Sequence, residues 1–139
     1  QAYLFFGKSG SGKTTTARNA GKRLILSDDL VGVLPTDENV AAHSTPFWNR
    51  GWAQQAKTSA LVAGFYRLVK SQTVTLEPMR ESIAVSEILS CIPIVPQNEA
   101  YCAQLIPTIQ NMIDKVGVHY LHLRQDDAYW DVLRLGAGS

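Results

Sequence analysis

The chain has 139 residues, enough for one domain with a buried core, and 45% of them are hydrophobic, as in globular proteins. Its formal net charge of +1 gives no indication of nucleic acid or a membrane surface as a partner, and no apolar run approaches the ~20 residues of a membrane-spanning helix. The two cysteines, Cys91 and Cys102, lack metal-ligand spacing, so we expect buried thiols in a cytoplasmic protein.

The chain opens with a predicted strand that runs into a glycine-rich loop. Residues 2–6 are apolar at every position, which predicts a central strand in a sheet covered on two sides. Residues 7–14 follow the G-x-x-x-x-G-K-T pattern of a phosphate-binding P-loop. Glycines allow several N–H groups to turn toward one anion, and the following helix adds its dipole. The candidate nucleotide-binding residues are Gly7, Lys8, Ser9, Gly10, Ser11, Gly12, Lys13, Thr14 and Thr15.

Two residues of this motif have more specific predicted roles. Lys13 would carry a mobile ammonium group to the terminal phosphates, and the Thr14 hydroxyl would ligate Mg²⁺. The alternative is a Gly- and Ser-rich turn with a chance Lys-Thr pair. The strand before the loop and the helix after it favour a site for a nucleoside triphosphate such as ATP.

An acidic pair follows the loop at short spacing. We expect a two-turn helix from Thr14 to Ala20, a stop at Gly21, and a second strand over residues 22–27 that ends at Asp28 and Asp29. This path would return the two carboxylates to the phosphates, where one could hold Mg²⁺ and the other could accept a proton from an attacking hydroxyl. The alternative is a polar strand end that opens a turn.

Residues 9–15 and 23–31 together resemble the nucleotide site shared by HPr kinase/phosphorylase and phosphoenolpyruvate carboxykinase. The chain is more similar still to stand-alone bacterial HPr-kinase-like proteins, in which segments like residues 42–48 and the Tyr129-Trp130 helix also occur. The resemblance implies a P-loop nucleotide-binding domain of that type. It also implies metal binding by Thr14, Asp28 and Asp29, and the catalytic residues Lys13, Asp28 and Asp29, with Asp29 as general base.

The sequence departs from HPr kinase at three points. Thr15 stands where HPr kinase has an acidic residue, which is nearer the carboxykinase pattern, and the helix after the loop is shorter. HPr kinase also uses a histidine before its P-loop, in a region that the given sequence does not contain. Because the sequence opens at Gln1, close to a strand and without an initiating Met, we expect an N-terminal segment to precede residue 1 in the full-length protein. Carboxykinase distributes its ligands over a far longer chain, which disfavours decarboxylating chemistry.

Two weaker site candidates follow the acidic pair. Residues 31–34 and 39–43 flank a turn at 35–38, which predicts a β-hairpin that could partly cover the nucleotide. His43, near its end, could reach a phosphate or a substrate, but a solvated histidine is the alternative. Arg50, in an aromatic loop, could stabilise the transferred phosphate, or it could be a surface arginine on a packed loop.

The rest of the chain reads as core elements without assigned chemistry. The spacing of apolar residues predicts further strands and helices. Pro107 should kink or split the helix predicted over residues 102–116. Asp126 or Asp127 is expected to cap the final helix. The predicted strands are residues 60–70, 73–76 and 118–124, and the predicted helices are 85–92, 102–116 and 128–133.

The sequence therefore predicts an α/β fold, with a mixed sheet and flanking helices in a single domain over residues 1–135 and a flexible tail at 136–139. The expected activity is ATP- and Mg²⁺-dependent transfer of a phosphoryl group to a protein serine or a small-molecule hydroxyl. Two alternatives stay open: a non-catalytic ATP-binding sensor, and an ordinary P-loop metabolite kinase or NTPase. The expected partners are the nucleotide and the phospho-acceptor, with a homo-oligomer possible and base specificity undetermined.

Overall fold

The computed structural model describes residues 1–8, 10–21, 23–27, 30–46, 58–92 and 99–136, which form an α/β fold. In the described part of the chain, four consecutive strands and then two helices lie between an N-terminal strand–helix pair and a C-terminal strand–helix pair, and most of the predicted elements are present within a few residues of their expected bounds. The described elements are β1 (Ala2–Phe6), α1 (Lys13–Arg18), β2 (Gly32–Pro35), β3 (Val40–His43), β4 (Ser59–Lys70), β5 (Thr75–Pro78), α2 (Glu81–Ser90), α3 (Glu99–Val116), β6 (Val118–Leu123) and α4 (Tyr129–Gly136).

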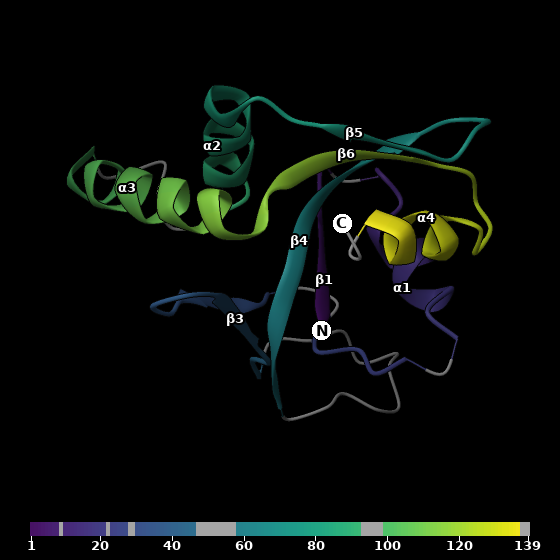
Figure 1. The fold of residues 1–139 in the computed structure, drawn as a ribbon, viewed down its shortest axis with the longest axis horizontal. Coiled ribbons are helices and arrows are strands. Elements are labelled where there is room, and N and C mark those ends of the chain that lie inside the picture. The colour runs from purple at the N-terminus through teal and green to yellow at the C-terminus, as the bar shows by residue number, and fades with distance from the viewer. Residues whose placement is uncertain (9, 22, 28–29, 47–57, 93–98, 137–139) are drawn as a thin grey trace.

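The long strand β4 organises a mixed sheet (Figure 1). The strand order is β2-β3-β4-β6-β5, and β1 also pairs with β4. Pairing of β1 with β4 and of β4 with β6 is parallel, whereas the β2–β3, β3–β4 and β5–β6 pairs are antiparallel. The mixed sheet is therefore confirmed. The central place expected for β1 belongs to β4, because within the described residues β1 pairs only with β4.

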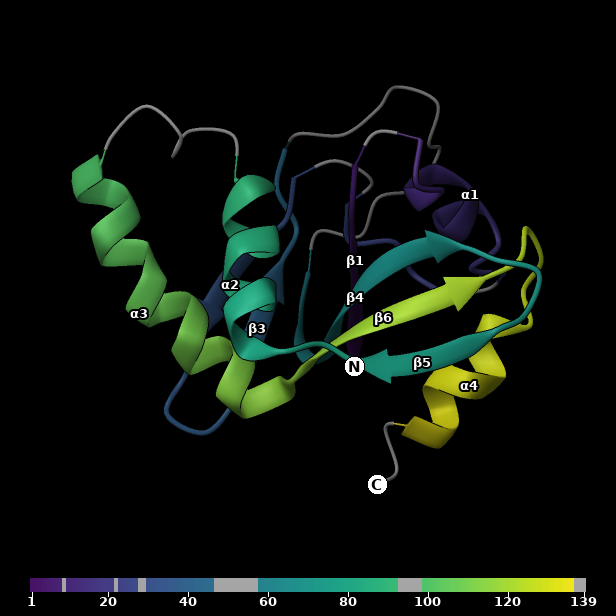
Figure 2. The same cartoon turned by 90° about the horizontal axis from the view of Figure 1, so that it is seen from above.

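Helices cover both faces of the sheet, as the apolar pattern of β1 predicts. Leu4 and Phe6 pack on the cluster that includes residues of α2 and α3, and Tyr3 and Phe5 pack on the cluster that includes residues of α4. Figures 1 and 2 show α2 and α3 on one side of β1 and β4, with α1 and α4 on the other. In the described part of the chain, no helix is both long and apolar enough to cross a lipid bilayer.

The predicted strand over residues 22–27 is wrong for its described part, because residues 23–27 form no strand. Arg23 is held in a turn: its backbone N–H and its guanidinium both donate to the Ala20 carbonyl, and the guanidinium lies 3.9 Å from the centre of the Trp130 ring. Leu24 is 76% exposed. Ile25 and Leu26 still pack on opposite core clusters, so the alternation reflects burial on two faces without strand pairing.

Three smaller expectations also need adjustment. Pro107 does not split α3, which continues through it as one helix, with the proline on the exposed side. Strand β5 begins two residues later than predicted. Cys91 is exposed at the C-terminal end of α2 and Cys102 is partly exposed, so the expectation of two buried thiols is wrong.

Candidate functional site

The glycine-rich loop, residues 7–12, connects β1 directly to α1. Gly7, Gly10 and Gly12 have φ angles of 154°, 82° and 100°, a region that side chains strongly disfavour. A Cβ atom at Gly7 would lie 2.7 Å from the Ser11 Oγ and 2.8 Å from the Arg67 Nη1. A Cβ at Gly10 or Gly12 would instead meet no atom within 4 Å. The loop is therefore closely packed where it leaves the strand and open where it approaches the helix.

Lys13 ties the two ends of this loop together. Its Nζ donates to the Gly7 carbonyl at 2.6 Å and to the Lys8 carbonyl at 3.1 Å. The ammonium thus lies beside the start of the loop although Lys13 begins the helix. Because an ammonium has three N–H donors, one donor is left for a ligand.

Hydroxyl groups line the rest of the loop. The Ser11 Oγ is buried and has no hydrogen-bond partner in the described part of the chain. Thr14 and Thr15, on the first turn of α1, are exposed to solvent. Helix α1 has only six residues, Lys13–Arg18, and ends two residues before the predicted end at Ala20. Its dipole therefore adds less to this site than we expected from the sequence. A buried hydroxyl without a partner and an open loop wall both fit a hydrogen-bonding anion such as a phosphate.

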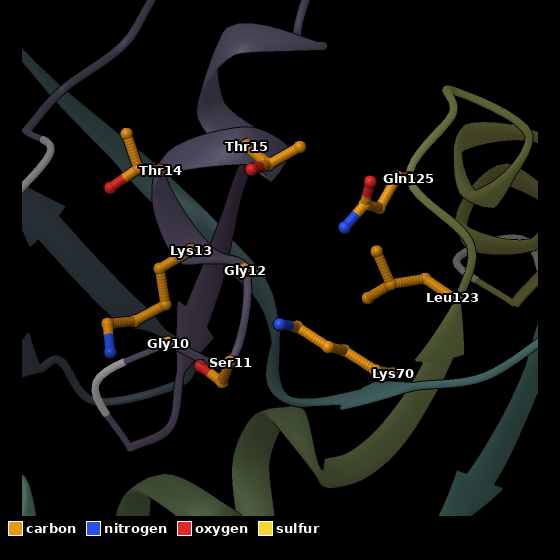
Figure 3. A pocket seen from close by; sticks show the side chains of 9 residues that line it. All are labelled: Gly10, Ser11, Gly12, Lys13, Thr14, Thr15, Lys70, Leu123 and Gln125. Atoms are coloured by element: carbon orange, nitrogen blue, oxygen red, sulfur yellow. The ribbon is translucent and has the colours of Figure 1, made fainter.

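A cavity of about 370 Å³ opens beside the loop (Figure 3). It lies at the carboxyl ends of the parallel strands β1, β4 and β6, the edge at which α/β sheets commonly bind ligands. The loop and the first turn of α1 form one wall, and the ends of β4 and β6 form the other. The lining residues are Gly10, Ser11, Gly12, Lys13, Thr14, Thr15, Lys70, Leu123 and Gln125.

Among the described residues that line the cavity, lysines supply positive charge and none is a carboxylate. Lys70, the last residue of β4, extends its ammonium toward the loop near Gly12 in Figure 3. Within the described residues no hydrogen bond or ion pair engages this ammonium. Sequence reasoning missed Lys70 and Gln125, because only the β1–β4–β6 pairing brings them to the loop. The lining as a whole favours an anionic ligand.

A half-buried ion pair between Arg67 and Glu87 lies beside Gly7, at the start of the loop. The Arg67 Nε donates to the Glu87 Oε2 at 2.8 Å, and its Nη1 donates to the Leu68 carbonyl at 2.9 Å. The Arg67 side chain is 15% exposed and reaches Gly7, whereas Glu87 comes from α2. This pair links α2 to the loop. The negative charge of the Glu87 carboxylate opposes the positive charge of the Arg67 guanidinium.

Helix α4 closes the far end of α1. The Tyr129 hydroxyl donates to the Thr16 carbonyl at 2.8 Å, and the Trp130 Nε1 donates to the Asn19 carbonyl at 3.1 Å. Burial raises the pKa of Tyr129 to about 12. The last carbonyls of a helix have no partner within the helix, so these two bonds satisfy groups that would otherwise be buried without one. They hold α1, and with it Lys13, in position.

Asp126, which follows β6, has its oxygens engaged locally. One accepts a bond from the Ala128 N–H at 3.1 Å just before α4, and the other pairs with the Arg124 Nε at 2.9 Å. The bond to Ala128 closes a turn two residues after Asp126 and does not reach an N–H group of α4, so the expected capping of the helix by this acidic pair stays a prediction. Among the residues with described positions, no three histidine, cysteine or acidic side chains form a group that could hold a metal ion.

Several predicted site residues are not brought to the loop or lie outside the described residues. The hairpin is confirmed as β2 and β3, but its partner is the start of β4, where His43 is opposite Ser59. Phe6, just before the loop, is opposite Arg67, eight residues further along β4, or about 26 Å at 3.3 Å per residue. The structure therefore does not bring His43 and the loop together. Ser9, Asp28, Asp29 and Arg50 lie outside the described residues.

Comparison of the chain with family models, with curated proteins and with solved structures yields no match. The geometry of the loop and of the cavity is therefore the basis for assigning a function.

Proposed function

We propose that the chain is an ATP- and Mg²⁺-dependent phosphotransferase of the HPr-kinase-like type, acting on a hydroxyl of a protein serine or a small molecule. One observation carries this proposal: a glycine-rich loop with left-handed glycines, clasped by Lys13, opens onto a positively charged cavity at the carboxyl ends of parallel strands. Such a loop suits the terminal phosphates of a nucleotide. Likeness of the sequence to HPr-kinase-like proteins suggests the acceptor class.

Each group of the loop has a defined role in this proposal. The third N–H of Lys13 binds a terminal phosphate oxygen while the other two stay on the Gly7 and Lys8 carbonyls. Lys70 adds a second positive charge from the opposite wall. Thr14, with Asp28 and Asp29, would hold Mg²⁺, which when bound neutralises charge on the phosphates.

The proposed transfer moves one phosphoryl group and one proton. The acceptor oxygen forms a bond to the terminal phosphorus of ATP, and the bond from that phosphorus to the bridging oxygen breaks, which leaves ADP. The proton of the acceptor hydroxyl passes to Asp29. Lys13 and Lys70 stabilise the negative charge that spreads over the transferred group and the leaving phosphate.

A second function, a nucleotide-binding module without catalysis, is favoured by one observation. None of the nine described residues that line the cavity is acidic, so none of these nine can act as the general base. In this alternative ATP binds with the same loop contacts, and the outcome is capture of a partner instead of turnover. An ordinary NTPase is less favoured, because β4 ends in Val69 and Lys70 and so supplies no acid from its own last residues, and the oxygens of Asp126 are engaged elsewhere.

Calorimetry with ATP and Mg²⁺, followed by a transfer assay with labelled ATP and a lysate fraction of proteins and metabolites, tests both functions. Lys13→Met should weaken ATP binding roughly 10- to 100-fold, the value of one charge-assisted hydrogen bond. Lys115→Met, on α3, is the control and should bind ATP normally. Asp29→Asn should bind ATP but lose transfer.

The outcomes separate the hypotheses. Transfer that survives in Asp29→Asn removes this residue from the chemistry. Tight ATP binding without transfer to any acceptor supports the binding module. Wild-type protein that binds no ATP rejects both the ATP-dependent phosphotransferase and the ATP-binding module.

A further inference from the structure

The wall of the cavity opposite the loop carries groups that phosphates alone do not need. It is formed by Leu123, the last residue of β6, and by Gln125, two residues further on. Figure 3 shows the Gln125 amide turned toward the first turn of α1, with the Leu123 side chain beside it. In the described part of the chain no hydrogen bond engages this amide. Leu123 is 6% exposed and belongs to the core, so its exposed edge has a fixed position.

We infer that this wall, Leu123 and Gln125, is the subsite for the base of the bound nucleotide, and that it accepts adenine and guanine alike. The inference rests on the proposed function, because it assumes that the loop holds the phosphates. It goes further by assigning the nucleoside end of the ligand to the end of β6.

Size and position support this assignment. The cavity of about 370 Å³ lies within the range of roughly 300–1,000 Å³ that is typical of small-molecule sites, so it has room beyond a phosphate chain. The loop lies at one wall and Gln125 at the other, with Thr15 and Lys70 also on the lining. A nucleotide whose terminal phosphates occupy the loop would therefore direct its remaining part toward the end of β6.

The chemistry of the two side chains matches a nucleobase. A base has a flat apolar face and a polar edge, and Leu123 offers an apolar contact while Gln125 offers hydrogen bonds. The amide of glutamine presents both a donor and an acceptor and can rotate to exchange them. Adenine presents an amino donor beside a ring-nitrogen acceptor, and guanine presents a carbonyl acceptor beside a ring N–H donor, so the amide can pair with either.

The described residues of the lining include no group that would select between purines. A carboxylate that accepts the two N–H groups of guanine would favour GTP, but the end of β6 offers the neutral amide of Gln125, and none of the nine described lining residues is acidic. A neutral amide makes hydrogen bonds of similar strength with both bases. We therefore expect the dissociation constants for ATP and GTP to agree within about tenfold, since a tenfold ratio corresponds to one modest hydrogen bond.

Calorimetric titration with three ligands, ATP, GTP and inorganic tripolyphosphate, each with Mg²⁺, tests the subsite in the intact chain. Gln125→Leu should weaken ATP and GTP binding about threefold to tenfold, the effect of one neutral hydrogen bond, and should leave tripolyphosphate binding unchanged. Gln104→Leu is the matched control, because Gln104 is exposed on α3 and does not line the cavity. It should bind all three ligands like the wild type.

A second variant checks the base preference. Gln125→Glu removes the donor and adds a carboxylate, so it should weaken ATP more than GTP. Circular dichroism of each variant verifies its fold, which substitution of an exposed side chain should leave intact.

The failures are distinguishable. If wild-type protein binds neither ATP nor tripolyphosphate, the proposed function itself is wrong. If tripolyphosphate binds as tightly as ATP, or if Gln125→Leu binds ATP as the wild type does, the subsite is wrong while the phosphate site stands. A wild-type preference for either purine beyond about tenfold contradicts the equal acceptance of both bases, because it needs more than one neutral hydrogen bond.

Discussion

Tyr129→Phe tests whether α4 supports the helix that carries Lys13. The substitution removes one hydroxyl from a side chain that is 0% exposed and leaves the aromatic ring in place. It deletes the 2.8 Å bond to the Thr16 carbonyl, near the end of α1. A buried carbonyl that loses its donor costs about 1–3 kcal/mol, and the small loss of volume adds little, so we expect about 1–2 kcal/mol of destabilisation.

Urea denaturation followed by tryptophan fluorescence measures this change. With a denaturant slope of about 1–3 kcal/mol per molar urea, the midpoint should fall by roughly 0.3–2 M. Tyr101→Phe is the control, because Tyr101 is 55% exposed on α3, and its midpoint should not move. Equal midpoints for the two variants would refute the support that we ascribe to Tyr129.

Alkaline pH provides an independent measurement of the same contact. Burial raises the pKa of Tyr129 from 10.0 to about 12, so the folded chain keeps a proton that the unfolded chain loses above pH 10. The free energy of unfolding should therefore decrease as pH rises from 10 to 12, and should be unaffected by this group below pH 10. In Tyr129→Phe this decrease should be smaller. Some should persist, because burial also raises the pKa of Tyr66 to about 12.

Three further predictions concern the loop and the sheet. Gly7→Ala should destabilise the fold by about 1–3 kcal/mol in urea titrations, because a φ of 154° and contact with Arg67 both oppose a side chain. Burial lowers the pKa of His119, so stability should fall as pH drops below 6.5, and His119→Gln should remove that part of the acid dependence. Lys70→Gln should weaken ATP binding about tenfold and reduce its salt dependence in calorimetry, and unchanged binding would exclude a phosphate contact for Lys70.

Local patterns in the sequence predict much of the fold because their physical causes are local. The apolar run of β1, the glycines of the loop, the turn between β2 and β3, and the spacing of α3 all act over a few residues. The exception, residues 23–27, shows the limit of the approach. Its side chains alternate between two core clusters, as those of a strand do, but Arg23 is drawn into a turn by Ala20 and Trp130.

Which residues line the site depends on the pairing of strands that are far apart in the sequence, so these residues are much harder to predict from the sequence. Lys70 and Gln125 line the cavity only because β4 and β6 are parallel neighbours, with Lys70 opposite Leu123. The same limit applies to His43, which a plausible hairpin places at the other end of β4. Turn chemistry predicts the hairpin, but the strand it joins depends on the packing of the whole sheet.

The bond between Tyr129 and Thr16 spans 113 residues, which has a consequence for synthesis on the ribosome. The glycine-rich loop emerges among the first residues of this sequence, yet the helix that follows it gains its closing partner only after α4 has been translated. At about 5–20 residues per second, this delay is roughly 6–23 s. During that interval the nascent loop would lack its support, so the nucleotide binding that we propose should be a late event in the maturation of the domain.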